Sequence, residues 1–183
     1  MPLVQVILFS VAVLAFSGLE TYLASRQKDD DDDSQDAGSL KTITRLRNVS
    51  FITAIVSAIF PVLSIPGSRG IHLLIGSALI MAGFTIRAWA IARLGQYFTS
   101  LVMTHADHTL VIDGPYKYIR HPGYTGGLLF YLGIGTATGS LWGLLLIMVL
   151  MSYGIDQRIK VEERLMISSF GEEYIDYMKK TEN

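Results

Sequence analysis

Cysteine is absent from this 183-residue chain. Disulfide bonds, thiolate metal sites and cysteine nucleophiles are therefore excluded. A chain of this length is expected to form one domain. An excess of positive charge is lacking as well, because the formal net charge is −1. A nucleic-acid partner would call for a basic surface, so no such partner is expected.

Charged side chains are missing from four long apolar stretches. These cover residues 2–19, 51–68, 70–86 and 122–155, with lengths of 18, 18, 17 and 34 residues. A bilayer core of about 30 Å is crossed by roughly 17–25 helical residues. The first three stretches therefore predict one transmembrane helix each. The fourth predicts two, joined at the small, turn-prone residues 136–140 into a helical hairpin over residues 122–157.

The first stretch has an alternative interpretation as a secretory signal peptide. It lacks a basic region before its apolar core, although Ala24-Ser25 resembles a cleavage site. Glu20 and a long polar segment follow it, and we expect a true first span. The fold class predicted is an all-α integral membrane protein with about five transmembrane helices.

Lys and Arg are distributed unevenly between the two sides of this topology. With five spans, the side that includes the C-terminus carries thirteen of the fifteen Lys and Arg residues, and the other side carries only Arg69. Arg87 lies inside the third span, near its cytoplasmic end. Because basic residues concentrate in cytoplasmic loops, the pattern predicts a multi-pass protein with a cytoplasmic C-terminus.

The chain divides into two regions on these grounds. Residues 1–94 would hold three transmembrane helices and an acidic cytoplasmic loop at 25–48, in which residues 29–33 are all Asp. We interpret the Asp run as a solvated linker. Residues 95–183 would form the catalytic region, which consists of a polar segment, the hairpin and the C-terminal tail.

Groups able to do chemistry gather in that second region. Residues 95–124 contain three of the four histidines and four of the nine tyrosines. Asp113-Gly114-Pro115 predicts a turn, and Pro122 is suited to the first position of a helix. Taken singly, such residues are more often plain interfacial anchors. Ionisable groups beside a membrane core are nevertheless candidates for function.

The tail is predicted to be helical. Arg158 and Glu162 are four residues apart and would share one helix face, which also fits a simple surface ion pair. Apolar residues recur every three to four positions over 165–178, which predicts an amphipathic cytoplasmic helix. Gly133-Ile-Gly135 followed by Gly139 loosely resembles a nucleotide-binding loop. Gly135, Gly139 and Gly143 also keep GxxxG spacing, which in an apolar hairpin favours close helix packing.

A set of motifs over about the last 90 residues resembles the isoprenylcysteine carboxyl methyltransferase family. In this sequence they are His108-Thr-Leu-Val111, Gly114-Pro-Tyr116, Arg120-His-Pro-Gly-Tyr124, Arg158 with Glu162-Glu163, and Phe170-Gly-Glu-Glu-Tyr174. The Arg-His-Pro-x-Tyr element alone is shared with phospholipid methyltransferases and sterol reductases. The first 95 residues match only as apolar spans.

The resemblance implies methyl transfer from S-adenosylmethionine, without a metal, to the carboxylate of a prenylcysteine on a prenylated protein or analogue. The implied cofactor-binding residues are Leu101, His108, Thr109, Leu110, Val111, Tyr116, His121, Pro122, Gly123, Tyr124 and Glu162, and Arg158 would face the substrate carboxylate. Lys160 and Val161 stand where the family is often more acidic, which leaves the substrate preference open. The active site would face the cytoplasm, from the endoplasmic reticulum of a eukaryote or the plasma membrane of a prokaryote.

Other functions stay open at this point. A phospholipid or other small-lipid methyltransferase would act on an amine, which Arg158 would repel. A related membrane reductase would consume NADPH. A membrane scaffold or small transporter is less expected, because transport predicts ionisable groups at mid-membrane depth and the spans offer only Arg87.

Overall fold

The computed structural model describes residues 2–25, 38–60, 62–95 and 110–181. Within these ranges the regular elements are helices, and Ser64 and Ser140 form an isolated β-bridge. In chain order the helices are α1 (Pro2–Ser25), α2 (Ser39–Ile59), α3 (Arg69–Leu94), η2 (Gly114–Lys117), α4 (Pro122–Ala137), α5 (Leu141–Phe170) and α6 (Glu172–Met178).

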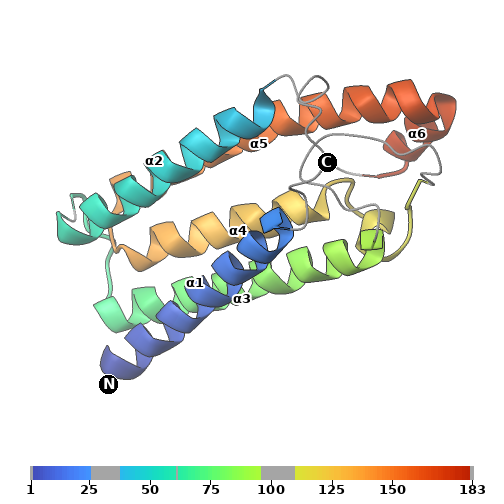
Figure 1. Cartoon of the computed structure of the whole chain (residues 1–183). Coiled ribbons are helices and arrows are strands. Elements are labelled where there is room, and N and C mark those ends of the chain that lie inside the picture. The colour runs from blue at the N-terminus through green and yellow to red at the C-terminus, as the bar shows by residue number, and fades with distance from the viewer. Residues whose placement is uncertain (1, 26–37, 61, 96–109, 182–183) are drawn as a thin grey trace.

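The five long helices lie side by side in pairs (Figure 1). α3 packs along α4, α2 packs along α5, α1 crosses α3, and α4 lies against α5. The short elements η2 and α6 lie together at the end of the bundle that holds the C-terminal ends of α3 and α5 and the start of α4. This end contains the residues singled out by the sequence, and the opposite end contains the 138–140 turn.

Four glycines bring α3 and α4 into backbone contact. A Cβ atom placed on Gly76 would lie 2.6 Å from the carbonyl oxygen of Gly133, and a Cβ on Gly126 would lie 2.6 Å from the carbonyl oxygen of Gly83. The two glycines of α3 are seven residues apart, and so are the two glycines of α4, which corresponds to two helical turns. Because a larger residue would force the two backbones apart, this glycine seam fixes the position of α4 on α3.

Aromatic side chains fill the centre of the bundle. The rings of Phe16 and Phe130 stack with centroids 3.9 Å apart, and Tyr131 packs edge-on against Phe130 at 5.2 Å. Ile80 and Ile147 are fully buried beside them. The core therefore draws on α1, α3, α4 and α5 together.

The end of the bundle far from the site is closed by backbone hydrogen bonds. Leu141 donates to the carbonyl of Leu63 at 3.0 Å, and Ile65 donates to that of Gly139 at 2.9 Å. Leu63 has a left-handed backbone, with φ 51°. The hydroxyl of Ser140 adds a bond to the carbonyl of Val62 at 2.8 Å. The loop after α2 is thereby fastened to the turn of the α4–α5 hairpin.

A helical hairpin was expected over 122–157. α4, the turn at 138–140 and α5 form a hairpin that begins at Pro122 as predicted, but α5 continues past residue 157 to Phe170. The second span differs from its expected bounds, because α2 covers Ser39–Ile59 and not residues 51–68. Residues 39–48, which were expected to belong to the 25–48 loop, are helical. The tail is also not one helix, because it breaks at Gly171 with φ 55°.

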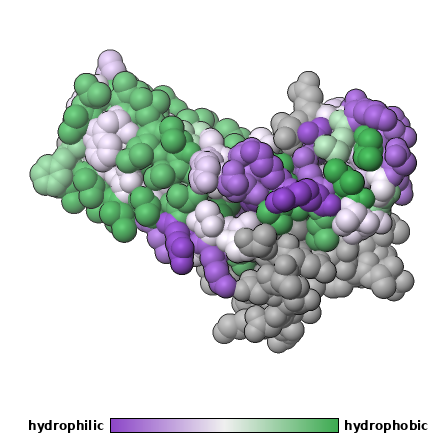
Figure 2. Space-filling model, turned by 90° about the horizontal axis from the view of Figure 1, so that it is seen from above, coloured by the Kyte–Doolittle hydropathy of each residue, from purple (hydrophilic) through white to green (hydrophobic). Residues whose placement is uncertain are grey.

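Apolar side chains are abundant on the surface. On the face drawn in Figure 2, apolar residues cover one end of the molecule and hydrophilic residues gather toward the other end. Exposed apolar residues include Leu14, Ile52, Ile55, Ile59 and Val149. Among the described helices, α3 is the one that is long and apolar enough by composition to cross a membrane. Within α1, Val6–Glu20 is a shorter apolar helical stretch. The expected count of five spans is therefore not confirmed by this criterion.

Candidate functional site

The loop before α4 is held against the end of α3. Gly114 has a left-handed backbone with φ 60°, and a Cβ there would lie 2.9 Å from Cγ of Arg93. Nε of Arg93 donates to Oδ1 of Asp113 at 3.1 Å. The glycine thus permits the close approach that the Asp113-Gly114-Pro115 turn requires. This turn places Tyr116 in η2, four residues before Arg120.

Arg158 lies inside the protein and joins three helices. Only 4% of it is exposed. From α5 its Nη1 donates to Oγ of Ser39 in α2 at 2.7 Å, and its Nε donates to the hydroxyl of Tyr124 in α4 at 3.3 Å. A buried guanidinium is costly unless its donors are used. These contacts hold the guanidinium against the first turn of α4.

His121, Arg120 and the Glu162-Glu163 pair form one polar cluster. Nε2 of His121 lies 3.2 Å from Oε1 of Glu163, and Nε of Arg120 donates to the same oxygen at 3.0 Å. Because an ionised carboxylate only accepts hydrogen bonds, Nε2 of His121 carries the proton in this contact. The hydrogen bond from His121 lowers the pKa of Glu163, and Arg120 adds to this against the effect of burial. Glu163 is therefore an ionised anchor for the start of α4.

Glu162 differs from its neighbour. Its Oε2 is buried and has no hydrogen-bond partner among the described residues. Nδ1 of His121 lies 3.9 Å from it. Buried carboxylate oxygens are normally satisfied, and an orphaned one beside polar groups indicates a place where a ligand supplies the donor. The amino and hydroxyl groups of S-adenosylmethionine would fit this need.

Tyrosines line the same region. The hydroxyl of Tyr177 donates to the carbonyl of Tyr116 at 2.6 Å, and the rings of Tyr174 and Tyr177 lie 5.8 Å apart. Burial raises the pKa of Tyr116 and of Tyr174, and it raises the pKa of Tyr177 to about 12. At neutral pH these phenols are uncharged, so they offer aromatic faces and O–H donors. Such faces suit a sulfonium cation.

The end of the tail closes over the cluster. Nη1 of Arg120 donates to the carbonyls of Met178 at 3.2 Å and Thr181 at 2.6 Å. Together with the bond from Tyr177 to Tyr116, these contacts tie α6 to the segment before α4. The tail therefore covers one side of the space around Glu162.

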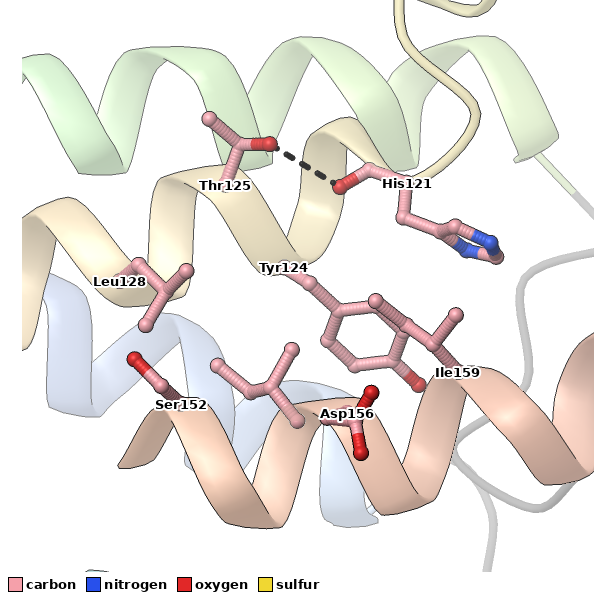
Figure 3. A pocket seen from close by; sticks show the side chains of 8 residues that line it. His121, Tyr124, Thr125, Leu128, Ser152, Asp156 and Ile159 are labelled. Atoms are coloured by element: carbon pink, nitrogen blue, oxygen red, sulfur yellow. Dashed lines mark hydrogen bonds between the residues drawn. The ribbon is translucent and has the colours of Figure 1, made fainter. Parts of the chain in front are cut away.

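A pocket of about 240 Å³ opens between α4 and α5 beside this cluster. It is lined by His121, Tyr124, Thr125, Leu128, Ser152, Ile155, Asp156 and Ile159. Figure 3 shows His121 and the Tyr124 hydroxyl at one end of the group, with Leu128 and Ser152 at the other. The pocket thus joins the polar cluster to an apolar surface between two helices, which is the character of a binding site for an amphipathic ligand.

Most of the site residues named from the sequence lie in this region. Tyr116, His121, Pro122, Tyr124, Glu162 and Arg158 lie where η2, α4 and α5 meet, and the carbonyl of Gly123 turns toward α3. Leu110 and Val111 are half-buried at the start of the last described segment. Leu101, His108 and Thr109 lie outside the described residues.

Three residues that contact the site or lie beside it were not predicted from the sequence. Ser39 was assigned to a loop, and nothing in its surroundings indicates an arginine 119 positions later. Glu20 and Arg87 were noted only as charges near the ends of spans, yet they pair with each other beside the site. A search for opposite charges at the same depth in different spans would have suggested that pair.

The family model for phospholipid methyltransferases matches residues 71–173, more than half of the chain. This chain belongs to the phospholipid methyltransferase family. The matched range begins in α3 and ends in α6, and α1 and α2 lie outside it.

Curated relatives of this family member confirm the resemblance predicted from the sequence. A Schizosaccharomyces pombe protein named protein-S-isoprenylcysteine O-methyltransferase is 37% identical over 100 residues, which cover 54% of this chain and 42% of that protein. Two further proteins of the same name are similar to this chain. The one from Tribolium castaneum is 35% identical over 62% of this chain and 42% of its own length, and the one from Saccharomyces cerevisiae is 37% identical over 58% of this chain and 45% of its own length. The chain thus matches less than half the length of these relatives.

A solved structure shares the fold. It is that of the eukaryotic intramembrane Ras methyltransferase, an isoprenylcysteine carboxyl methyltransferase. The TM-score is 0.61, the sequence identity is 24%, and the match covers 75% of this chain and 50% of the other. The all-helical architecture of the described residues is therefore similar to the fold of that protein.

Proposed function

We propose that this protein transfers a methyl group from S-adenosylmethionine to the carboxylate of a lipophilic acceptor, and that the acceptor is a C-terminal prenylcysteine. The observation that carries the proposal is the position of Arg158. Its guanidinium is buried within hydrogen-bonding distance of Tyr124, and Glu162 lies one helical turn further along α5. Tyr124, whose hydroxyl accepts from that guanidinium, lines the pocket between α4 and α5, so a carboxylate bound there would lie next to the partner of Arg158.

The division of labour follows from the groups present. When bound, S-adenosylmethionine supplies an electrophilic methyl group on a sulfonium. Glu162 would accept hydrogen bonds from its polar groups, and Tyr116 would present an aromatic face to it. Arg158 would orient the acceptor carboxylate by a charge-assisted fork. A carboxylate is already nucleophilic at neutral pH, so positioning of the two substrates is the main requirement.

The acceptor's apolar part has a place in the same proposal. Leu128, Ile155 and Ile159 line the pocket between α4 and α5. A prenyl chain could occupy that apolar part of the pocket and extend into the bilayer, while the cofactor arrives from the polar end of the bundle. We propose five spans with this end cytoplasmic, which the thirteen-to-one distribution of Lys and Arg supports.

One observation favours a second acceptor class. The carboxylate of Asp156 also lines the pocket, and it would suit the amine headgroup of a phospholipid. Lys160 pairs with Asp156 at 2.6 Å and offsets its charge. We therefore rank the phospholipid amine below the carboxylate.

The test is methyl transfer from labelled S-adenosylmethionine by the full chain in detergent or proteoliposomes. The acceptors compared are an N-acetylated farnesylcysteine, its carboxamide, phosphatidylethanolamine and an isoprenoid acid. Transfer to the farnesylcysteine and none to its carboxamide is expected. Preference for phosphatidylethanolamine would overturn the acceptor class, and failure to bind S-adenosylhomocysteine would overturn the cofactor assignment.

The orientation is tested separately. Reporter fusions at Gly67, in the loop after α2, and at the C-terminus should report opposite sides of the membrane. Both reporters on one side would exclude the proposed topology. This result would leave the chemistry of the site untouched, since the acceptor panel tests it independently.

A further inference from the structure

An ion pair between α1 and α3 lies directly behind the site. Nε and Nη2 of Arg87 donate to the two carboxylate oxygens of Glu20, the second of them at 3.0 Å. The side chains are 15% and 32% exposed. A two-point fork of this kind fixes the plane of the guanidinium as well as its position. The pair therefore determines the direction in which the remaining nitrogen points.

That remaining nitrogen reaches the first turn of α4. Nη1 of Arg87 donates to the carbonyl of Gly123 at 2.9 Å. A carbonyl has two lone pairs, so Gly123 can accept this bond in addition to the one within its own helix. Arg87 is thus anchored to Glu20 on one side and to the backbone between Pro122 and Tyr124 on the other.

The same arginine packs against α4 and also acts on the site through its charge. A Cβ on Gly126 would lie 2.9 Å from Cβ of Arg87, so the arginine stem lies against α4 one turn further on. Burial raises the pKa of Tyr116, with Glu162 and Tyr177 adding to it, and the Arg87 guanidinium opposes this rise. Its charge is therefore close to Tyr116 as well.

Glu20 could serve simply to neutralise the charge of Arg87 near the membrane core, but that role would not explain the hydrogen bond from Arg87 to the carbonyl of Gly123. We propose that Glu20 and Arg87 act as a positioning pair, in which Glu20 orients Arg87 and Arg87 holds the first turn of α4 so that His121 and Tyr124 face the cofactor. This inference rests on the proposed function for the identity of the ligand. It extends the site to α1, which lies outside the part of the chain matched by the family.

The test replaces the pair by apolar residues of similar size, in Glu20→Leu/Arg87→Met. A buried ion pair exchanged for apolar side chains often leaves stability unchanged, so the midpoint of thermal unfolding should stay near that of the wild type. The donor to Gly123 is lost, however. We expect the Kd for S-adenosylhomocysteine to rise roughly tenfold, as for the loss of one charge-assisted hydrogen bond, and the KM for S-adenosylmethionine to rise more than the KM for the acceptor.

A conservative variant and a control complete the experiment. Glu20→Gln keeps the size of the side chain and a single acceptor, so it should fold and weaken S-adenosylhomocysteine binding by roughly threefold to tenfold. Lys179→Met removes the exposed pair with Asp176 and should change neither property. Wild-type affinity in Glu20→Gln, or in a folded double variant, would overturn the inference. Absence of binding in the wild type would instead overturn the proposed function, and the inference with it.

Discussion

The helix pair α3–α4 and the helix pair α2–α5 are joined by different kinds of contact. Backbone meets backbone at Gly76 with Gly133 and at Gly83 with Gly126. Side chains make the α2–α5 joint, where Arg158 bonds Ser39 and where the nearest atom to a Cβ on Gly154 is the end of the Leu46 side chain, at 2.9 Å.

The difference bears on how the site works. Backbone contacts cannot adjust without moving a whole helix, whereas side chains can change rotamer. The first turn of α4 is thus fixed by α3. The other wall of the pocket is α5, which is held to α2 by side chains that can change rotamer. We expect an acceptor to be admitted by movement on the α5 side, against a cofactor site that stays in place.

The largest expected effect is a break in the glycine seam. Gly126→Val should destabilise the protein by about 3 kcal/mol, because overpacking at a tight contact forces the backbones apart. A Cβ at Gly126 would lie 2.6 Å from a backbone oxygen, whereas a Cβ at the neighbouring Gly127 meets nothing within 4 Å. Gly127→Ala should be neutral or stabilising by up to about 1 kcal/mol. Thermal unfolding in detergent measures both, and equal effects would show that the seam is not tight.

Substitutions of Arg158 test the side-chain contact between α2 and α5. Arg158→Ala should lower kcat/KM on a farnesylcysteine analogue by about 100-fold, the value of a lost hydrogen bond between charged groups. Arg158→Lys keeps the charge without the planar fork and should still be impaired. Cofactor affinity should survive in both. Ser39→Ala is the control, since it removes the α2 partner and keeps the guanidinium. Wild-type turnover in Arg158→Ala would refute the proposed role.

The neighbouring glutamates should separate ligand binding from stability. Glu162→Gln should weaken S-adenosylhomocysteine binding by roughly tenfold or more, because a neutral amide is a weaker acceptor than a carboxylate. His121→Ala should weaken it in the same direction. Glu163→Gln should instead lower the unfolding temperature, because Glu163 bonds Arg120 and His121. Calorimetric titration and thermal unfolding distinguish the two, and interchangeable effects would contradict the assignment.

Acid should loosen the joint between the start of α4 and the end of α5. The pKa of Glu163 is lowered in the folded protein, first by the hydrogen bond from His121. A lowered folded pKa gives stability that is present above the unfolded pKa, about 4.3 for Glu, and is lost as the pH falls through the folded pKa. The difference in unfolding temperature between wild type and Glu163→Gln should therefore shrink below about pH 4.3. A constant difference down to pH 3 would exclude this origin.

The smallest effect expected is at the tail. Tyr177→Phe removes one hydrogen bond to the carbonyl of Tyr116 and should cost about 1 kcal/mol. Loosening of the tail should appear as faster proteolysis near α6. An unchanged cleavage rate would show that the bond from Tyr177 does not hold the tail.

The order of the five long helices in the described residues could be predicted from the sequence, but the ends of α2 could not. An uncharged run marks residues suited to the bilayer, whereas a helix continues wherever its backbone bonds are satisfied. The charged residues Lys41, Arg45 and Arg47 are therefore helical in α2. The helix ends at Ile59, just before Pro61, although the apolar run continues to Ser68.

The site could be predicted only where its residues lie close together in the chain. His121 and Tyr124 share one turn, and Arg158 and Glu162 share one helix face, so their spacing carries information. Glu20 and Arg87 are 67 positions apart. Such partners are set by how helices cross, which no local pattern encodes. The same holds for the glycine pairs, because their seven-residue spacing on each helix does not say which helix they face.

The distances along the chain impose an order of assembly. Arg158 and Ser39 are 119 positions apart, and the whole of α3 and α4 lies between them. As the chain is made, α3 and α4 can pair as soon as both exist, while α2 remains without the helix it packs against until α5 emerges. A chain arrested after α4 should already hold its glycine seam and yet leave α2 open to membrane chaperones and proteases. Synthesis of the last long helix would then be the step that releases the protein from quality control.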